Sequence, residues 1–288
     1  MTQPRRLWRA MLYVPANVPR FIEKASHAGA DAIVLDLEDS VPAGRKREAR
    51  EGLAQAIALA GSGGADVLVR VNRPLRIAVG DIEAAAAGGA AGILLTKAMG
   101  PDHVRLAAEI LLETETQPMA IIPMIETARA LQQVDAIAAA HPRIAGLLVG
   151  AEDLALDCGA AADDELIVMA KRRTVFACVA AGVSPFGTLG TVADYRKPEH
   201  VRSVALAAKR SGFVGATCIH PALLSVLREA FSPTAAEIDL ARRQLAAAAE
   251  AGSHGRGSFT VDGLMVDEPI LIRARRMLAD IEGTTTHD

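Results

Sequence analysis

The stretch Asp31-Ala32-Ile33-Val34-Leu35-Asp36-Leu37-Glu38-Asp39 introduces the pattern on which the rest of the chain is built. Its apolar run, residues 32–35, is typical of a strand buried on both faces of a parallel sheet. The three carboxylates that follow must be solvated, paired or bound to a cation, because burying a lone carboxylate is costly. Parallel α/β folds bind ligands at the carboxyl ends of their strands, so we predict a site at this end.

Apolar runs and alanine-rich helical stretches alternate from here to about residue 230. Strands are predicted at residues 11–15, 32–38, 67–72, 92–97, 119–126, 144–150, 183–189 and 215–220. Helices are predicted at residues 20–28, 45–60, 80–87, 101–115, 127–140, 165–181 and 194–210. Eight strands, each followed by a helical stretch, indicate a (β/α)8 TIM barrel. The competing open, doubly wound sheet usually has fewer strands and a glycine-rich fingerprint after the first.

A different pattern follows the eighth strand. Helices are predicted at residues 233–251 and 270–281, separated by a glycine-rich segment at residues 252–258 and a short hydrophobic piece at residues 263–266. We therefore expect residues 1–230 to form the barrel domain. Residues 231–288 are expected to form a C-terminal helical segment that acts as a lid or an oligomerisation contact.

Composition limits the class of protein. Hydrophobic residues make up 51% of the chain and aromatic residues only 3%, which indicates an aliphatic α/β core. A net charge of −3 gives no electrostatic basis for binding nucleic acid. No apolar run approaches the ~20 residues of a membrane span, and no secretory signal is recognised. With three widely spaced cysteines, the sequence predicts a cytoplasmic protein without nucleic-acid or membrane partners.

Two carboxylates stand out at the ends of neighbouring predicted strands. Glu126 follows the apolar run at residues 120–125, and Asp153 follows the run at residues 147–150. No histidine or cysteine lies nearby in sequence, and Mg²⁺ is commonly held by one or two carboxylates with water and substrate oxygens. The alternative is that each carboxylate caps the helix that follows it.

Three further polar residues lie within or at the ends of predicted strands. Arg70 lies within an otherwise apolar strand, so it needs either a buried carboxylate partner, Asp36 or Glu38, or an anionic ligand. Lys97 would be a candidate for Schiff-base chemistry, but the acids nearby favour a charged ion pair. His220 is interpreted as a hydrogen-bonded structural residue in preference to a general base.

At this point the sequence resembles a known family. The matching pieces, in chain order, are residues 9–15, 35–41, Lys46 with Ala49-Arg50, residues 69–72, 125–128 and 150–154, Gly212-Phe213, and residues 219–221 and 266–269. The pattern is similar to the citrate lyase β-subunit-like branch of the HpcH/HpaI aldolase superfamily, which includes malyl-CoA and citramalyl-CoA lyases. The resemblance extends over nearly the whole chain.

The resemblance implies a site as well as a fold. It implies a Mg²⁺ ion held by Glu126 and Asp153, and Arg70 binding the oxygens of a 2-oxo acid as a catalytic residue. Further contacts to substrate or metal-bound water are implied for Arg9, Glu38, Asp39 and Glu126. The resemblance also implies that Asp267 reaches a neighbouring active site as an acid/base in a homotrimer, or a multiple of one.

The expected activity is therefore that of a Mg²⁺-dependent carbon–carbon lyase. It would cleave or form a malyl-CoA- or citramalyl-CoA-like 3-hydroxyacyl-CoA, whose two halves are an acyl-CoA and a 2-oxo acid. One alternative is a citrate lyase β subunit that acts on citryl carried by an acyl carrier protein. Another is a non-catalytic homologue that binds acyl-CoA.

Overall fold

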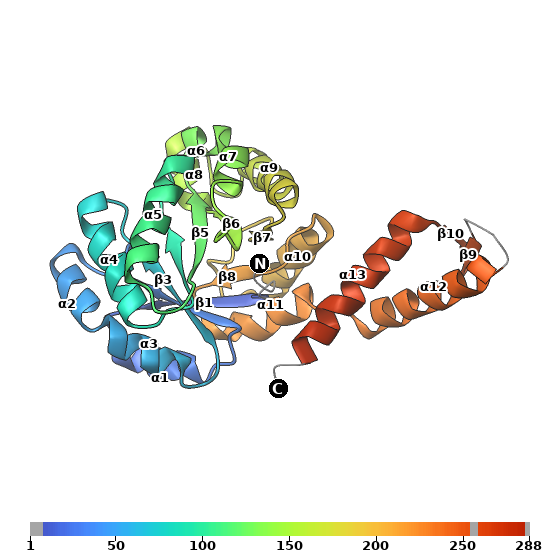
Figure 1. Cartoon of the computed structure of the whole chain (residues 1–288), viewed down its shortest axis with the longest axis horizontal. Helices are drawn as coiled ribbons and strands as arrows, with labels where there is room; N and C mark the ends of the chain where they lie inside the picture. Colours follow the sequence, from blue (N-terminus) through green and yellow to red (C-terminus); the bar gives the residue numbers. More distant parts are fainter. Residues whose placement is uncertain (1–7, 254–258, 286–288) are drawn as a thin grey trace. The chain divides into compact units, whose positions relative to one another are not determined.

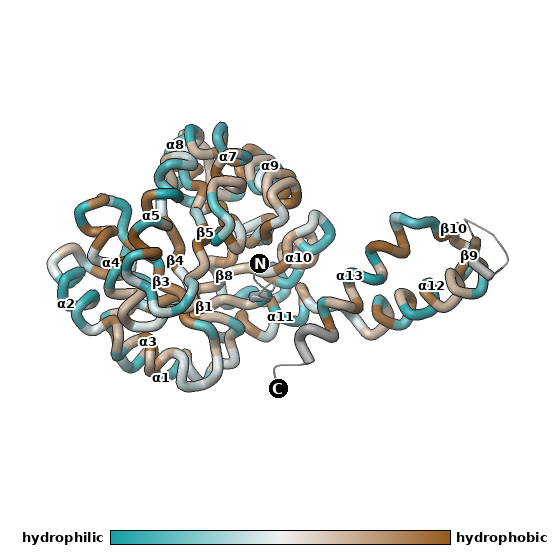
Figure 2. Tube along the Cα trace, in the orientation of Figure 1, coloured by the Kyte–Doolittle hydropathy of each residue, from teal (hydrophilic) through white to brown (hydrophobic). Residues whose placement is uncertain are grey.

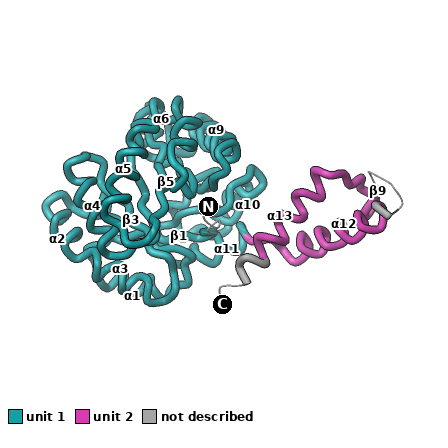
Figure 3. The backbone as a smooth tube through the Cα atoms, in the orientation of Figure 1, with its two compact units in different colours: residues 1–231 teal, residues 232–288 magenta. Residues whose placement is uncertain are grey.

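The structure, a computed structural model, describes residues 8–253 and 259–285. The chain divides into two compact units, residues 1–231 and residues 232–288 (Figure 3). Each unit is described by itself.

The first unit is built on eight parallel strands (Figure 1). These are β1 (Ala10–Pro15), β2 (Ala32–Asp36), β3 (Asp66–Val71), β4 (Gly92–Leu95), β5 (Ala120–Ile125), β6 (Gly146–Val149), β7 (Ser184–Phe186) and β8 (Ala216–Cys218). Their order in the sheet is β7-β6-β5-β4-β3-β2-β1-β8. A bridge between Phe186 and Gly215 joins the two ends, where the Gly187 N–H also donates to the Gly215 carbonyl at 2.8 Å. The predicted TIM-barrel fold is confirmed.

Helices surround the strands. They are α1 (Pro19–Ser26), α2 (Lys46–Glu51), α3 (Leu53–Gly61), α4 (Leu75–Ala87), α5 (Pro101–Thr114), α6 (Ala128–Gln132), α7 (Val134–Ala138), α8 (Ala151–Cys158), α9 (Glu165–Ala181), α10 (Pro198–Arg210) and α11 (Leu224–Phe231). Short 3-10 turns lie at Ala43–Arg45 and Pro221–Leu223. The single helix predicted at residues 45–60 is divided at Gly52, a residue that costs about 1 kcal/mol within a helix. The helix predicted at residues 127–140 is likewise two short helices.

The core has two layers because the strands bury both faces. The inner layer, inside the barrel, consists of Trp8, Met11, Ala32, Val34, Leu68, Leu94, Ala120, Ile122, Met124, Leu148 and Phe186. The alternate residues, such as Ile33 and Leu35 on β2, belong to the larger cluster between strands and helices. In Figure 2 the strands accordingly lie mostly toward the hydrophobic end of the scale. This arrangement explains why the stretch at residues 32–35 shows no polar alternation.

The second unit is a pair of helices joined by a hairpin. It comprises α12 (Ala235–Ser253), the antiparallel strands β9 (Phe259–Val261) and β10 (Leu264–Val266), and α13 (Glu268–Thr285). The hairpin turns at Asp262-Gly263, both with positive φ (51° and 78°), as in the Asp-Gly turns that suit tight hairpins. The sequence prediction treated residues 263–266 as a hydrophobic piece and missed this hairpin. Of the glycine-rich segment, residues 254–258 lie outside the described residues.

No helix in the described parts of the chain combines the length and the apolar character that crossing a membrane requires.

Candidate active site

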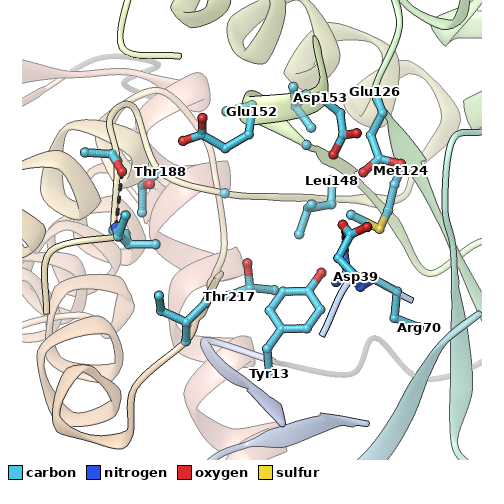
Figure 4. Close-up of a pocket in the computed structure, with 18 of the residues that line it drawn as sticks. Tyr13, Asp39, Arg70, Met124, Glu126, Leu148, Glu152, Asp153, Thr188 and Thr217 are labelled. Atoms are coloured by element: carbon cyan, nitrogen blue, oxygen red, sulfur yellow. Dashed lines mark hydrogen bonds and ion pairs between the residues drawn. The ribbon is translucent and has the colours of Figure 1, made fainter. Parts of the chain in front are cut away.

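The carboxyl ends of the barrel strands line a cavity of about 650 Å³ (Figure 4). Four of its side chains lie two residues beyond an inner-core residue of the same strand: Tyr13 after Met11, Asp36 after Val34, Arg70 after Leu68 and Glu126 after Met124. Because side chains alternate along a strand, each continues the inner layer of the barrel at its open end. Strand geometry therefore brings these four groups together.

Arg70 is held by carboxylates on β2 and in the loop that follows it. Its Nε and Nη2 atoms each lie 2.7 Å from one carboxylate oxygen of Asp36. Its Nη1 atom lies 2.9 Å from Glu38 and 3.4 Å from Asp39. Burial alone would raise the pKa of Asp36, but the hydrogen bonds and charge of Arg70 outweigh burial and lower it. The ion pair considered for Arg70 from the sequence is therefore present.

Lys97 forms a second ionic link across the site. Its Nζ atom lies 2.6 Å from Glu38 and 3.2 Å from Asp153. Burial opposes the charge of Lys97, yet these carboxylates together raise its pKa above the ordinary range. A permanently charged amine is a poor nucleophile, so the geometry supports the ion-pair interpretation of Lys97 over a covalent role.

The backbone of Lys97 also serves the site. Its φ of 46° is left-handed, which is uncommon for a residue with a side chain. The Lys97 N–H donates to the Glu126 carboxylate. Strained backbone of this kind often occurs at functional sites.

Glu126 is almost fully buried, with 1% of its surface exposed. Burial raises its pKa to about 7, and the charge of Asp153 adds to the rise against the opposing effect of the Lys97 N–H. Gly150 gives the carboxylate room, because a Cβ atom there would lie 2.6 Å from the Glu126 carboxylate oxygen. Glycine at position 150 therefore leaves the space that the Glu126 carboxylate occupies.

Glu126 and Asp153 fit the donor set that Mg²⁺ uses. Glu126 directly follows β5, and Asp153 lies in the first turn of α8, the helix that follows the adjacent strand β6. Their carboxylates are close enough to repel each other, a repulsion that a divalent cation would relieve. Among the residues that the structure describes, no three His, Cys, Asp or Glu side chains are grouped to hold a metal. The other positions around a cation here would therefore fall to water and substrate oxygens, as is usual for Mg²⁺.

Two basic residues on α2 fix the loops around the site. Lys46 donates from Nζ to the carbonyls of Leu37 and Glu38, at 2.9 and 2.8 Å. Arg50 donates to Asp81 at 2.7 Å, and Asp81, fully buried, accepts from both the backbone and the side chain of Asn72. The polar residues that follow β2 and β3 are thereby held in place.

The structure brings some of the predicted site residues together but not all of them. Glu38, Asp39, Arg70, Glu126 and Asp153 come together at the carboxyl ends of the strands. Arg9 does not join them. It precedes β1 at the amino end of the strand, and a six-residue strand spans roughly 20 Å.

Asp267 and His220 complete the set of predicted residues. Asp267 belongs to the second unit, where its carbonyl accepts from the first turn of α13. His220 stacks on Tyr195, with ring centroids 4.1 Å apart, and accepts a hydrogen bond from the Ala222 N–H at 3.2 Å. The structural interpretation of His220 is thus supported.

The sequence prediction missed two titratable residues that line the cavity. Tyr13 is one of them. It lies two residues after Met11 on β1, so both side chains face the inside of the barrel, and this spacing could have identified it. Lys171 is the other: it is buried on α9 and donates from Nζ to the Gly190 carbonyl at 3.3 Å. Burial lowers the pKa of Lys171. No strand-end pattern marks a helical lysine of this kind.

Comparison with known proteins identifies the family. A family model described as HpcH/HpaI aldolase/citrate lyase matches residues 9–221. The chain belongs to the HpcH/HpaI aldolase/citrate lyase family. As a member of this family it is 34% identical over 278 residues to (3S)-malyl-CoA thioesterase of Cereibacter sphaeroides (strain KD131), covering 96% of this chain and 95% of that protein.

Other relatives carry different names. Citrate lyase subunit beta-like protein of Deinococcus radiodurans is 32% identical, with 97% of this chain and 99% of that protein covered. Among solved structures, protein CitE from Mycobacterium tuberculosis in complex with magnesium, acetoacetate and coenzyme A matches with a TM-score of 0.79 and 30% identity. That match covers 96% of this chain and 98% of the other. The family thus contains members named as lyase subunits and as thioesterases.

Proposed function

We propose that this protein is a Mg²⁺-dependent carbon–carbon lyase. Its substrate would be a malyl-CoA- or citramalyl-CoA-like 3-hydroxyacyl-CoA, made from or cleaved to an acyl-CoA and a 2-oxo acid. The observation that carries the proposal is the pairing of Glu126, which follows β5, with Asp153, in the first turn of α8, beside Arg70 and Lys97. This donor set matches Mg²⁺, and a relative in the same family was solved with magnesium, acetoacetate and coenzyme A.

Glu126 and Asp153 would hold the ion. When bound, Mg²⁺ would supply a Lewis acid that polarises the oxygens of the oxo-acid half. The buried position of Glu126 and its bond from the Lys97 N–H fix the direction of its carboxylate before any ligand arrives. Preorganised groups of this kind need no rearrangement during the reaction.

Arg70 and Lys97 would balance negative charge within the site. In the cleavage direction the substrate hydroxyl loses its proton, the carbon–carbon bond breaks, and its electron pair passes into the enolate of the thioester. That enolate then takes a proton on carbon. Arg70 is fixed by Asp36 and so presents its charge without moving, which favours a transition state that carries developing negative charge.

The proton transfers need a separate acid/base, and Asp267 is the proposed group. It stands at the start of α13 in the second unit. In the arrangement that we propose, the protein is a homotrimer or a multiple of one, and Asp267 of one copy serves the cavity of its neighbour. Acid/base groups of this kind typically contribute about 10²–10⁴-fold to the rate.

The test is a panel of CoA thioesters with and without Mg²⁺. Release of 2-oxo acid and of free CoA thiol should be measured separately. We expect EDTA to abolish 2-oxo acid release, and Glu126→Gln or Asp153→Asn to reduce it more than about 100-fold, because losing even a ligand's hydrogen-bond partner costs about 10–100-fold. Asp135→Asn, at an exposed ion pair with Arg173, is the matched control. Full activity in the presence of EDTA would contradict the proposal.

A second candidate is thioester hydrolysis, which the 34% identical malyl-CoA thioesterase favours. Hydrolysis adds water and breaks the carbon–sulfur bond, so it releases free CoA thiol without 2-oxo acid. The same panel separates the two activities. Turnover only of citryl attached to an acyl carrier protein would favour a citrate lyase β subunit, and binding without turnover would favour a non-catalytic homologue.

A further inference from the structure

Tyr13 occupies the wall of the cavity next to the charged groups. It lies on β1, two residues beyond the inner-core residue Met11. The guanidinium carbon of Arg70 lies 5.1 Å from the centre of its ring, a cation–π contact. Figure 4 shows the side chain of Tyr13 reaching between Thr217 and Asp39, with its hydroxyl directed toward the middle of the site. The ring is thus fixed while its polar end faces the cavity.

The hydroxyl of Tyr13 has no hydrogen-bond partner among the described residues, although it is shielded from solvent. Leaving a buried polar group unpaired is unfavourable, because its hydrogen bonds to water are lost and not replaced. Of the carboxylates nearby, Asp36 accepts from Arg70. Glu38 is ion-paired with Arg70 and Lys97, and its Oε2 atom, like the Tyr13 hydroxyl, makes no hydrogen bond within the described residues. No described residue accepts from the Tyr13 hydroxyl, so an acceptor that arrives with a ligand would satisfy it.

The hydrogen-bond donors of Arg70 are already engaged by the protein. Its Nε, Nη1 and Nη2 atoms all face carboxylates of the protein, so its capacity for an anionic ligand is largely used. We propose that the Tyr13 hydroxyl donates a hydrogen bond to an anionic oxygen of the 2-oxo acid when the cavity is occupied. This inference rests on the proposed function, because it takes the 2-oxo acid as the ligand.

The electrostatic surroundings keep Tyr13 a donor. Burial raises the pKa of Tyr13 above its ordinary range; the charge of Arg70 opposes this rise, and the charges of Asp36 and Glu126 add to it. The hydroxyl consequently keeps its proton throughout the neutral range.

The experiment compares Tyr13→Phe with wild type in calorimetric titrations of pyruvate and oxaloacetate, with Mg²⁺ present. Phenylalanine keeps the ring beneath Arg70 and removes only the hydroxyl. We expect 2-oxo acid affinity to fall about 10- to 100-fold, the range for a hydrogen bond to a charged group. The unfolding midpoint of the ligand-free protein should not fall, because no native hydrogen bond is lost.

The control is Tyr195→Phe, the same chemical change in the only other tyrosine of the chain. Tyr195 stacks on His220, and 44% of its surface is exposed. Its substitution should leave 2-oxo acid affinity unchanged. Equal affinity of Tyr13→Phe and wild type, or a loss of stability without a loss of affinity, would overturn the inference alone. Wild type that binds neither 2-oxo acid with Mg²⁺ would count against the proposed function itself, and this inference would fall with it.

Discussion

Asp36 binds Arg70 through both of its carboxylate oxygens, each 2.7 Å from a different guanidinium nitrogen. The pair is mostly shielded from water, with 2% of the Asp36 side chain and 13% of the Arg70 side chain exposed. Two strands, β2 and β3, are thereby joined at the point where the site begins. Removing one partner would leave a charge buried without its counter-ion.

Substituting Asp36 by alanine should therefore destabilise the protein by about 3–5 kcal/mol. Denaturant unfolding monitored by circular dichroism measures the loss. The matched control is Asp135→Ala, which removes an exposed pair with Arg173 that also has two hydrogen bonds and should cost less than about 1 kcal/mol. Similar costs at the two positions would show that burial does not govern the strength of the Asp36–Arg70 pair.

Stability should also depend on pH through Asp36. Burial would raise its pKa, but Arg70 and the N–H groups of Glu38 and Ser40 hold it below the ordinary value. The folded state thus favours the ionised form, so its contribution is complete above the unfolded value of about 3.9 and is lost as pH falls through the folded value. Unfolding free energies at pH 7 and pH 3 should differ less for Asp36→Asn than for wild type.

Closure of the barrel should depend on Gly215. A Cβ atom there would lie 1.9 Å from the Trp8 carbonyl oxygen, so Gly215→Ala forces β1 away from β8. We expect a loss of about 3 kcal/mol or more, at the upper end of overpacking costs. Gly44→Ala is the control because nothing lies within 4 Å of its Cβ position. Thermal unfolding of the two variants checks the prediction, and equal midpoints would contradict it.

The three cysteines should react unequally. Burial raises the pKa of the Cys178 and Cys218 thiols to about 12, whereas Cys158 is exposed. A thiol-specific chromogenic reagent at neutral pH should label one thiol of the native protein and all three after denaturation, since the thiolate is the reactive form. Cys158→Ser should abolish the native signal. Labelling of more than one native thiol would contradict the burial of the other two.

If Asp267 of one copy serves the cavity of another, as proposed, two inactive variants should complement each other. Co-expressed Asp267→Asn and Glu126→Gln chains, each inactive alone, should form mixed oligomers in which some cavities combine an intact Glu126 with an intact Asp267. We expect activity to reappear in the mixture and an oligomeric mass in sedimentation. A monomeric mass, or no recovery from mixed oligomers, would refute the shared site.

The sequence predicted the parts of the site that follow strand ends. Glu126 and Asp153 could be identified because each follows an apolar run, and parallel strands deposit such residues at one edge. Gly150 and the backbone of Lys97 could not, because their contributions depend on close approach and on a left-handed φ. The assignment of Arg9 came from the resemblance alone, and the structure places Arg9 at the other end of β1.

The sequence predicted the fold, like the site, only in part. Continuous apolar runs marked the strands, because both strand faces are buried. The predicted strand ends extended too far, since polar residues such as Glu38 and Lys97 lie beyond the last ladder pairs. The hairpin at residues 259–266 was missed although Asp262-Gly263 is a strong turn signal. Its strands are only three residues long, too short for an alternation to be recognised.

Carboxylates outnumber cations in the cavity, and this imbalance has a kinetic consequence. Asp36, Glu38, Asp39, Glu126 and Asp153 lie around three cations, Arg70, Lys97 and Lys171. A 2-oxo acid is itself an anion, so it would meet a repulsive field until a divalent cation has entered. We therefore expect compulsory order, with the cation loading first and the organic acid second. Pyruvate titrated without Mg²⁺ should give no binding heat, and raising the metal concentration should lower the apparent KM for the acid.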